Sequence, residues 1–572
     1  MVIQMSKHGR FWLKSYDKHV PESLEGKYFT EDLGTILTNA MEKYSDRVGF
    51  YFMDSAFTYG EILDYARRFA TFLQQNGVKK GDVVAINLPN CPQYLFSVYG
   101  TYIAGAVCSG LSPLLSEAEM QYQLNDSDAK VVVTMDIIHE KRFSKIISKL
   151  PNLEILIPTN ISEYMGFGGF KVFMGKLIKK IPKGKMVPYP GKTVVPFLEV
   201  METPVDVKPV SIDAKKDLCL LQYTGGTTGR PKGTEITHSN LASNMLQFDV
   251  WLNREKGTDI VISAFPYFHI AGFFIGIYLT YIGASHIIIA NPRDTDHIIN
   301  EMLDKKPTVF GNVPTLFLMV QRNPKSKEIP DEILDNITLY VSGAAPFPAE
   351  AIRDFEKQFH TENKFVEVYG MTESAVLATV NPALGEKKIG TVGLPLPDTD
   401  VKLVNVETGE EVPIGEPGEI YLRGPQITKR YLKKPEETAE TYVDGWLHTG
   451  DVGVFDEDGY LKIVDRTKDM LSISGYKVYS VHVEDVLTKH PDIQLMAIIG
   501  LPDPNRPGSE IVKAVIQLKE GIEATDEVKE KILKYAQENL AKYEVPKKWE
   551  FVEELPTTAI GKVLKRALRK EE

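Results

Sequence analysis

Residues 221–240 read LQYTGGTTGRPKGTEITHSN, a stretch with four glycines, five threonines and two basic residues. The apolar run CLLQY leads into the glycines, which predicts a loop that follows a buried strand. Glycines let backbone N–H groups approach an anion closely. Thr224, Thr227 and Thr228 add hydroxyl donors, and Lys232 adds a positive charge. The composition therefore predicts a loop that binds phosphate.

This loop does not fit the P-loop of nucleoside-triphosphate hydrolases, which requires Gly, four residues, then Gly-Lys-Ser/Thr. In the three registers that the sequence offers, the second glycine is replaced by Arg230, Pro231 or Thr234. A flexible glycine linker is the simple alternative, but such linkers lack threonine runs and a buried strand before them. The loop is therefore expected to bind phosphate in some other way.

The bulk properties favour a multidomain enzyme. The chain has 572 residues, which is too long for a single hydrophobic core. Its residues are 43% hydrophobic and 25% charged, which is ordinary for a globular protein. A formal net charge of −11 argues against a protein that binds duplex nucleic acid. Cys91, Cys108 and Cys219 are scattered, so neither a disulfide framework nor a cysteine-rich metal site is expected. No secretory signal is recognisable at residues 1–19, and a cytoplasmic location fits these features.

Alternating helical and strand-like segments predict an α/β fold with largely parallel sheets. The helical pattern YGEILDYARRFATFLQQNG, for example, precedes the buried run GDVVAINLPN. From about 390 to 465 short strands and turns predict a small β-rich subdomain. We expect an N-terminal domain over 1–465, a hinge at 465–468 and a small α+β C-terminal domain over 466–572.

Residues 260–292 contain no Asp, Glu, Lys or Arg and could span a bilayer by length. Gly272 to Gly276 even matches the GxxxG pattern of membrane helices. However, Pro266, His269 and His286 interrupt the segment, and its end resembles a buried strand after a helix. A buried helix–strand unit is therefore the favoured interpretation.

Residues 164–198 carry seven lysines and no Asp or Glu, with phenylalanines interleaved. A solvated surface excursion is the simple explanation of this pattern. A basic amphipathic patch that touches an anionic membrane or ligand is the alternative. The sequence leaves both open, as it leaves open a homodimer.

Six segments in the same order resemble the motifs of the adenylate-forming superfamily, in its acyl-CoA synthetase and fatty-acid–CoA ligase branch. They are YTGGTTGRPKG (223–233), SGAAPFP (342–348), VYGMTES (368–374), GWLHTGD (445–451), DRTKDMLSISGYKVYS (465–480) and TTAIGKVLKRALR (557–569). The resemblance covers nearly the whole chain, from about Phe29 to Arg569. It implies that the protein activates a carboxylate with ATP, a reaction between two anions that depends on positioning and charge neutralisation.

The resemblance assigns roles to residues in each motif. Asp451 would grip the ribose, and Glu373, with Thr224, would hold Mg²⁺, a cation that prefers oxygen ligands. Lys562 would reach the reacting carboxylate and α-phosphate, and Arg466 would assist at ribose or phosphate. The implied contacts to ATP or AMP are Thr224, Gly225, Gly226, Thr227, Thr228, Gly229, Lys232, Gly343, Ala344, Ala345, Pro346, Val368, Tyr369, Gly370, Met371, Thr372, Asp451, Arg466 and Lys562.

The second half-reaction is also implied by the resemblance. The C-terminal domain would rotate about Lys468 after adenylation and bring a second loop to the site for CoA. That loop consists of Ser474, Gly475, Tyr476 and Lys477. The co-substrates would be ATP and CoA, with Mg²⁺ as cofactor.

The acyl site is expected in FPYFHIAGFF (265–274), which lacks an acidic or basic residue that would meet an amino-acid substrate. His269 is the candidate beside the carboxylate, although it could equally be a core histidine. Phe273, Phe274 and Gly343 are the further candidates for the pocket, and Phe273 lies where some long-chain relatives have an aromatic gate. Phe273 and Phe274 could equally be ordinary core residues. Apolar walls favour an alkyl chain.

Several functions remain open at this point. The favoured one is a ligase that joins a medium- to long-chain fatty acid to CoA, with His269, Thr224, Glu373 and Lys562 as catalytic residues. An aryl-acid (coumarate-like) CoA ligase and an enzyme that loads a carrier protein are alternatives. A catalytically silent protein that binds acyl groups or nucleotides is the non-enzymatic one.

Overall fold

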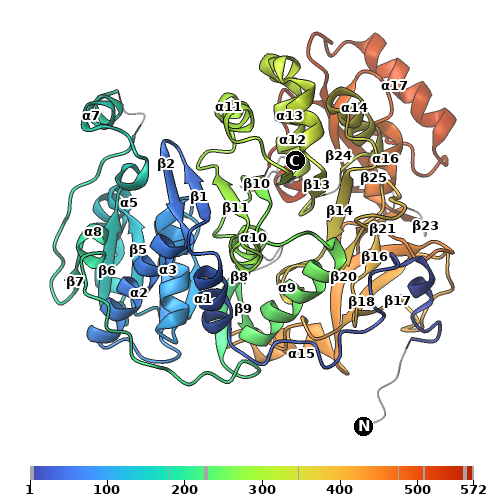
Figure 1. Ribbon diagram of the computed structural model, residues 1–572. Helices are drawn as coiled ribbons and strands as arrows, with labels where there is room; N and C mark the ends of the chain where they lie inside the picture. Colours follow the sequence, from blue (N-terminus) through green and yellow to red (C-terminus); the bar gives the residue numbers. More distant parts are fainter. Residues whose placement is uncertain are drawn as a thin grey trace.

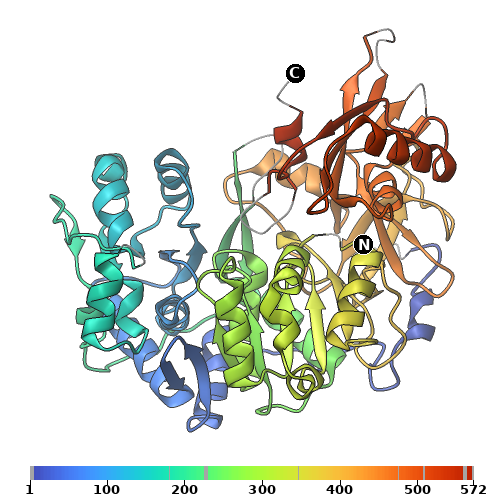
Figure 2. The same cartoon turned by 90° about the horizontal axis from the view of Figure 1, so that it is seen from above.

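The computed structural model describes residues 6–178, 181–224, 230–345, 347–473, 476–504, 506, 509–557 and 563–569. Two large sheets and a β-rich subdomain form the N-terminal part, coloured blue through yellow and orange in Figure 1. The elements after β21 (Leu461–Arg466) form a separate mass of orange and red beside them (Figure 2). The predicted α/β fold with a smaller C-terminal part is confirmed.

The first large sheet carries the glycine-rich loop at one edge. Its strands are parallel except for the last pair, the β8–β9 hairpin that flanks the loop. In order across the sheet they are β7 (Thr193–Val194), β6 (Ile155–Thr159), β5 (Val131–Met135), β3 (Val83–Asn87), β4 (Val107–Gly110), β8 (Leu218–Thr224) and β9 (Lys232–Thr237).

The second large sheet is parallel at its centre, where consecutive strands β12, β13 and β14 lie side by side. Parallel strands bring their carboxyl ends to one edge, where ligands of α/β sheets gather. Its order is β16 (Leu394–Pro395), β15 (Thr379–Val380), β14 (Phe365–Tyr369), β13 (Leu339–Ser342), β12 (Val309–Asn312), β10 (Ile260–Ser263), β11 (Ser285–Ile288), β1 (Val48–Phe52) and β2 (Ser55–Thr58).

Helices cover these sheets, and their starts follow from the sequence. Thr58 and Glu61 form a capping box that begins α2, for example, because each side chain satisfies a backbone N–H at the helix start. The helices of this part are α1 (Leu33–Lys43), α2 (Tyr59–Gln75), α3 (Pro92–Ile103), α4 (Glu117–Asp126), α5 (Asp136–Ile138), α6 (Ser144–Ile146), α7 (Gly169–Leu177), α8 (Phe197–Val200), α9 (His238–Leu252), α10 (Ile270–Tyr281), α11 (Thr295–Lys305), α12 (Pro314–Arg322), α13 (Asp331–Asn336) and α14 (Ala349–Phe359).

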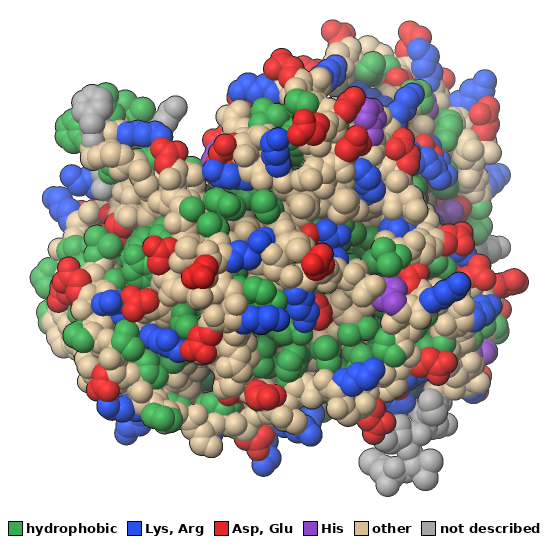
Figure 3. Space-filling view, in the orientation of Figure 1, with side chains coloured by type: hydrophobic (Ala, Val, Ile, Leu, Met, Phe, Trp, Pro, Cys, Tyr) green, Lys and Arg blue, Asp and Glu red, His purple; other side chains and the backbone are tan. Residues whose placement is uncertain are grey.

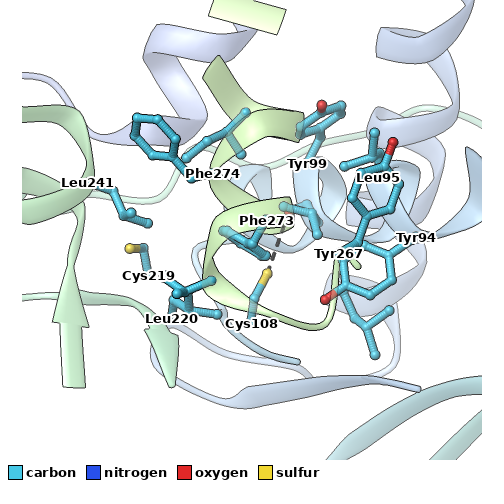
Figure 4. Close-up of a cluster of buried hydrophobic side chains, with 14 of the residues drawn as sticks. Tyr94, Leu95, Tyr99, Cys108, Cys219, Leu220, Leu241, Tyr267, Phe273 and Phe274 are labelled. Atoms are coloured by element: carbon cyan, nitrogen blue, oxygen red, sulfur yellow. Dashed lines mark hydrogen bonds between the residues drawn. The ribbon is translucent and has the colours of Figure 1, made fainter. Parts of the chain in front are cut away.

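The uncharged segment 260–292 forms strand, helix and strand, β10, α10 and β11, inside the protein. Side chains of α10 pack against α3, β4, β8 and α9 in a buried cluster that links the two large sheets (Figure 4). Among the described residues, no helix combines the length and the apolar character needed to cross a bilayer. The prediction of a buried helix–strand unit is confirmed.

The remaining strands form smaller sheets. The β-rich sheet consists of β17 (Asp400–Val404), β18 (Gly418–Arg423), β20 (Trp446–Phe455), β19 (Tyr442–Val443) and β21 (Leu461–Arg466), with α15 (Pro435–Thr441) beside it. The last part contains β22 (Leu471–Ile473), β23 (Tyr476–Val478), β24 (Ile493–Pro502), β25 (Glu510–Leu518), β26 (Lys548–Phe551), α16 (Ser480–Leu487), α17 (Asp526–Asn539) and α18 (Lys565–Leu568). Its two apolar clusters draw their described members only from residues 471–568.

Candidate active site

A cavity of about 1380 Å³ lies where the two large sheets, the β-rich sheet and the C-terminal part meet. Residues at the carboxyl ends of β8, β13 and β14 line it, as do residues of β21 and of the segment after β26. This is the edge at which α/β sheets bind ligands. The predicted motifs, far apart in sequence, therefore converge on one cavity.

The residues that flank the glycine-rich loop, at the ends of β8 and β9, border this cavity. Thr224 ends β8, Lys232 begins β9, and the two residues pair across the hairpin and line the cavity. The ammonium of Lys232 lies 4.6 Å from the ring centroid of Tyr431. The predicted contacts Gly225, Gly226, Thr227, Thr228 and Gly229 lie outside the described residues.

Glu373 presents a buried carboxylate next to Lys232. It lies in a single turn after β14, and its side chain accepts a hydrogen bond of 2.6 Å from the hydroxyl of Tyr431. Burial raises the pKa of Glu373, while the hydrogen bond from Tyr431 and the charge of Lys232 act in the opposite direction. A carboxylate held in this way would bind a divalent cation readily, because the cation supplies the missing charge.

Asp451 is held by two partners from the neighbouring motifs. The hydroxyl of Tyr369 donates to its carboxylate at 2.8 Å, and Nε of Arg466 lies 3.0 Å from the other oxygen. Asp451 is the dominant cause of the raised pKa of Arg466. Of these three residues only Arg466 lines the cavity, and Asp451 contacts that lining residue.

Two glycines form a close-packed wall of the cavity. A Cβ at Gly370 would lie 1.7 Å from the carbonyl oxygen of Val376, and one at Gly343 would lie 2.6 Å from the side chain of Val368. Only glycine therefore fits at residue 370 without a backbone shift. The predicted residues that line this wall are Gly343, Ala344, Val368, Gly370, Met371 and Thr372. Ala345 was also predicted but does not line the cavity, and Pro346 lies outside the described residues.

The acyl candidates separate into two groups. His269 caps the start of α10, its Nδ1 accepting from the N–H of Ala271 at 3.3 Å, and burial lowers its pKa to about 4. His269 and Phe274 line the cavity. Phe273 instead points towards Cys108 in the buried cluster and packs edge-on against Tyr102 (Figure 4). The structure therefore places Phe273 in the core rather than at the cavity.

The C-terminal part reaches the cavity with residues that flank one of its two predicted loops. Thr557 and Leu564 line it, together with Lys468, whose pKa is lowered by burial and by Arg466. Lys562, between Thr557 and Leu564, lies outside the described residues. In the predicted CoA loop, Lys477 pairs with Glu407 at 3.0 Å and does not line the cavity. Ser474 and Gly475 are outside the described residues, as is the side chain of Tyr476.

Tyr431 is the main site residue that the sequence did not predict. It links the loop lysine to the carboxylate, because its ring faces Lys232 and its hydroxyl binds Glu373. Tyr431 stands in KRYLKKPEE, a charged run that shows no apolar periodicity. Further lining residues from the β-rich sheet that were not predicted are Glu419, His448, Thr449 and Gly450.

The donor set near Glu373 fits a magnesium ion that is shared with phosphate groups. Across the described ranges, no group of three or more His, Cys, Asp or Glu side chains gathers as a protein-only metal site. Mg²⁺ typically takes one or two protein oxygens and completes its shell with phosphate and water. Glu373 and Thr224 are the residues that would hold it.

Comparisons with known proteins agree with this geometry. A long-chain-fatty-acid–CoA ligase of Bacillus subtilis (strain 168) is 36% identical over 579 residues, covering 98% of each chain. A feruloyl-CoA synthase of Amycolatopsis sp is 33% identical over 518 residues, which cover 90% of this chain and 94% of the relative. The solved structure of an anthranilate CoA ligase in complex with anthranoyl-AMP has a TM-score of 0.81 at 26% identity, over 95% of this chain and 96% of the other.

The family itself is defined by two matched regions. Residues 37–432 match the AMP-binding enzyme family, and residues 482–562 match the AMP-binding enzyme C-terminal domain. The predicted resemblance to adenylate-forming acyl-CoA synthetases is thereby confirmed. Both matched regions contain segments that converge on the cavity, Thr224 and Glu373 in the first and Thr557 in the second. The chain belongs to the AMP-binding enzyme family.

Proposed function

We propose that the protein is an ATP-dependent ligase that joins a long-chain fatty acid to CoA. The observation that carries the proposal is the continuity of the cavity, which extends from Lys232, Glu373 and Arg466 to apolar side chains of β10, β12, α9 and α10. A charged end suits ATP, and an apolar end suits an alkyl chain, since each buried methylene gains about 0.8 kcal/mol. The proposal is supported by relatives that are named long-chain-fatty-acid–CoA ligases and that match this chain over nearly their full length.

In the first half-reaction, a carboxylate oxygen of the acid forms a bond to the α-phosphorus of ATP, and the bond to pyrophosphate breaks. Lys232 and the glycine-rich loop would hold the departing phosphates, and Arg466 with Asp451 would orient the ribose. Mg²⁺ held by Glu373 and Thr224 would neutralise phosphate charge. Neutral His269, at the entrance of the apolar end, would border the carboxylate without adding a charge.

In the second half-reaction, the sulfur of CoA, having lost its proton, bonds to the acyl carbon, and AMP leaves with the oxygen. This step needs access for the thiol. Since Thr557 and Leu564 border the cavity while Lys477 lies away from it, we propose that the described arrangement serves adenylation. A rotation about Lys468 would bring the 474–477 loop in afterwards.

Isotope exchange between pyrophosphate and ATP, over a panel of alkyl and aryl acids, tests the substrate class. Exchange with alkyl acids of ten or more carbons, followed by AMP release that requires CoA, is expected. Exchange with aryl acids alone would contradict the fatty-acid substrate and favour the activity named for the feruloyl relative. AMP formation that a carrier protein but not CoA stimulates would indicate carrier loading, and no exchange with any acid would indicate a silent protein.

We further propose that α7 attaches the protein to anionic membranes, from which it would take its substrate. Phe173 and Leu177 are each 62% exposed and Ile178 is 57% exposed, an arrangement that leaves a helix face without protein partners among the described residues. Figure 3 shows hydrophobic side chains gathered on this projection at the upper left, beside Lys and Arg side chains. Lys183 and Lys185 follow on the same segment and are exposed.

Sedimentation with vesicles that contain phosphatidylglycerol tests the membrane contact. Replacing Phe173 and Leu177 by serine should lower vesicle binding at least ~10-fold, since each buried side chain of this size is worth about 1.5–3 kcal/mol. Leu384→Ser is the matched control, because Leu384 is 65% exposed in a loop after β15. Equal binding of all variants would exclude α7 as the anchor.

A further inference from the structure

The apolar end of the cavity has a regular wall built from alternate residues of parallel strands. Val261, Val309 and Leu339 lie side by side in one row, and Ser263, Gly311 and Val341 form the next row along. Alternate strand residues face the same side, so these rows face the cavity together. Gly343 lies one row further towards the nucleotide end, and Asp259 lies one row further away from it.

The opposite wall follows helical periodicity. On α10 the lining residues recur along one stripe, and on α9 two lining residues stand one turn apart. These residues are Phe274, Ile275, Tyr278 and Leu279 of α10, Ile282 at its end, and Phe248 and Leu252 of α9. A channel between helix and sheet therefore runs antiparallel to the direction of β10, from the carboxyl end of the strand to its amino end.

A polar side-chain pair stands at the far end of this channel. Arg254 donates two hydrogen bonds to Asp259, of 2.6 and 2.5 Å, and the hydroxyl of Thr308 donates to the same carboxylate at 2.6 Å. The side chain of Asp259 is 4% exposed and that of Arg254 is 23% exposed, yet both line the cavity. The side chain of Arg254 therefore borders both the channel and the solvent.

We propose that the Arg254–Asp259 pair is the stop that sets the longest acyl chain the enzyme accepts, an inference that rests on the proposed fatty-acid substrate. A chain that reached further would have to displace Arg254 and leave the buried carboxylate of Asp259 unpaired, which is strongly unfavourable. One additional methylene improves binding only about fourfold. Extension beyond the pair therefore lowers the reactivity of an acid instead of raising it.

The strand geometry gives the length at which this happens. One interval of two residues separates the two rows, and one more at each end reaches Gly343 and Asp259, which lie just beyond their strands. Each interval covers about 6.6 Å in strand geometry, which gives about 20 Å in total. Carbon–carbon bonds of about 1.5 Å at tetrahedral angles advance about 1.3 Å each, so about 15 carbons fill the channel. Saturated acids of roughly 14–16 carbons are expected to react best, by the same spacing.

The chain-length profile of kcat/KM, measured with saturated acids from eight to twenty carbons, tests the stop. For Arg254→Ala, the ratio of kcat/KM for a twenty-carbon acid to that for a ten-carbon acid should rise about 15-fold over the ratio of the unmodified enzyme, the gain expected from about two buried methylenes. Arg254→Lys, which keeps a charge beside Asp259, should restore much of the original ratio. Lys256→Gln is the matched control, because Lys256 belongs to the same loop but pairs with Asp249 and Tyr281 outside the channel.

A second variant decides the matter if Arg254→Ala does not fold. Leu252→Phe adds volume at the same end, and it should move the optimum two or more carbons shorter. An unchanged optimum in Leu252→Phe, or an unchanged ratio in folded Arg254→Ala, overturns the stop. Such a result differs from a failure of the proposed function, in which no alkyl acid supports pyrophosphate exchange with the unmodified enzyme.

Discussion

The two ends of the cavity are built on different principles. At the nucleotide end, polar groups from four separate motifs are held by specific contacts, such as those of Glu373 with Tyr431 and of Asp451 with Arg466. At the acyl end, rows of side chains from β10, β12 and β13 supply only shape and apolar surface until the Arg254–Asp259 pair. The first end depends on the identity of single residues, and the second depends on length and volume.

The largest effect is expected at the nucleotide end from Lys562→Ala. Adenylate formation should fall at least ~100-fold, the scale of removing one preorganised charge donor from a transition state. Conversion of preformed acyl-adenylate to acyl-CoA should be largely kept, because the 474–477 loop would serve that step. Pyrophosphate exchange and thioester formation from synthetic adenylate measure the two steps separately.

Lys542→Ala provides the control for that experiment, since Lys542 is an exposed lysine of the same C-terminal part. It should leave both half-reactions unchanged. Equal losses in the two half-reactions of Lys562→Ala would mean that one arrangement of the domains serves both steps.

The second-largest effect is expected at the acyl end, where His269 should make the free energy of unfolding depend on pH. Burial lowers the pKa of His269 to about 4 from an ordinary value of 6.5, so the folded chain holds this side chain neutral where the unfolded chain protonates it. The stability that the neutral, buried His269 contributes is complete above pH ~6.5. It is lost as the pH falls towards 4, because the unfolded chain binds a proton that the folded chain does not. Between pH 7 and 5 the loss should amount to about 2 kcal/mol.

His269→Asn removes the titration and keeps an oxygen that can cap α10 as Nδ1 does now. The free energy of unfolding in urea should therefore fall about 2 kcal/mol less between pH 7 and 5 in this variant than in the unmodified chain. His482→Asn, at an exposed position of α16, should behave like the unmodified chain. The same pH dependence in all three proteins would show that His269 is protonated in the folded state too.

The sequence was informative about the residues whose chemical identity defines the site, but not about the arrangement of strands and helices around it. Thr224, Lys232, Gly343, Gly370, Glu373 and Arg466 were all predicted from their motifs, and they meet at one cavity. The chain between 260 and 292 was correctly predicted as a buried helix–strand unit, because Pro266, His269 and His286 interrupt it and its end resembles a buried strand. The sheet order, by contrast, follows from long-range packing that no local pattern records.

The acyl end shows why the sequence left the positions of its side chains open. Phe273 and Phe274 are adjacent and identical in type, but successive helix residues point about 100° apart, so one faces the core and the other the cavity. Arg254 and Asp259 are ordinary charged residues in sequence. They become a pair at the channel end only because a short loop turns between α9 and β10.

The smallest effect is expected from Tyr431→Phe, which tests whether specific contacts extend beyond the motifs. Loss of the 2.6 Å hydrogen bond should make the carboxylate of Glu373 a poorer cation ligand, because burial already raises its pKa. The Mg²⁺ concentration for half-maximal adenylation should rise about 10-fold, the scale of one hydrogen bond to a charged group.

Tyr442→Phe is the control, because the hydroxyl of Tyr442 bonds Thr428 instead of the carboxylate. A shift in apparent Mg²⁺ affinity with Tyr431→Phe alone would show that the nucleotide end also depends on Tyr431, a residue that belongs to none of the motifs. An equal shift with Tyr442→Phe would mean that general packing under the β-rich sheet, rather than this bond, positions Glu373.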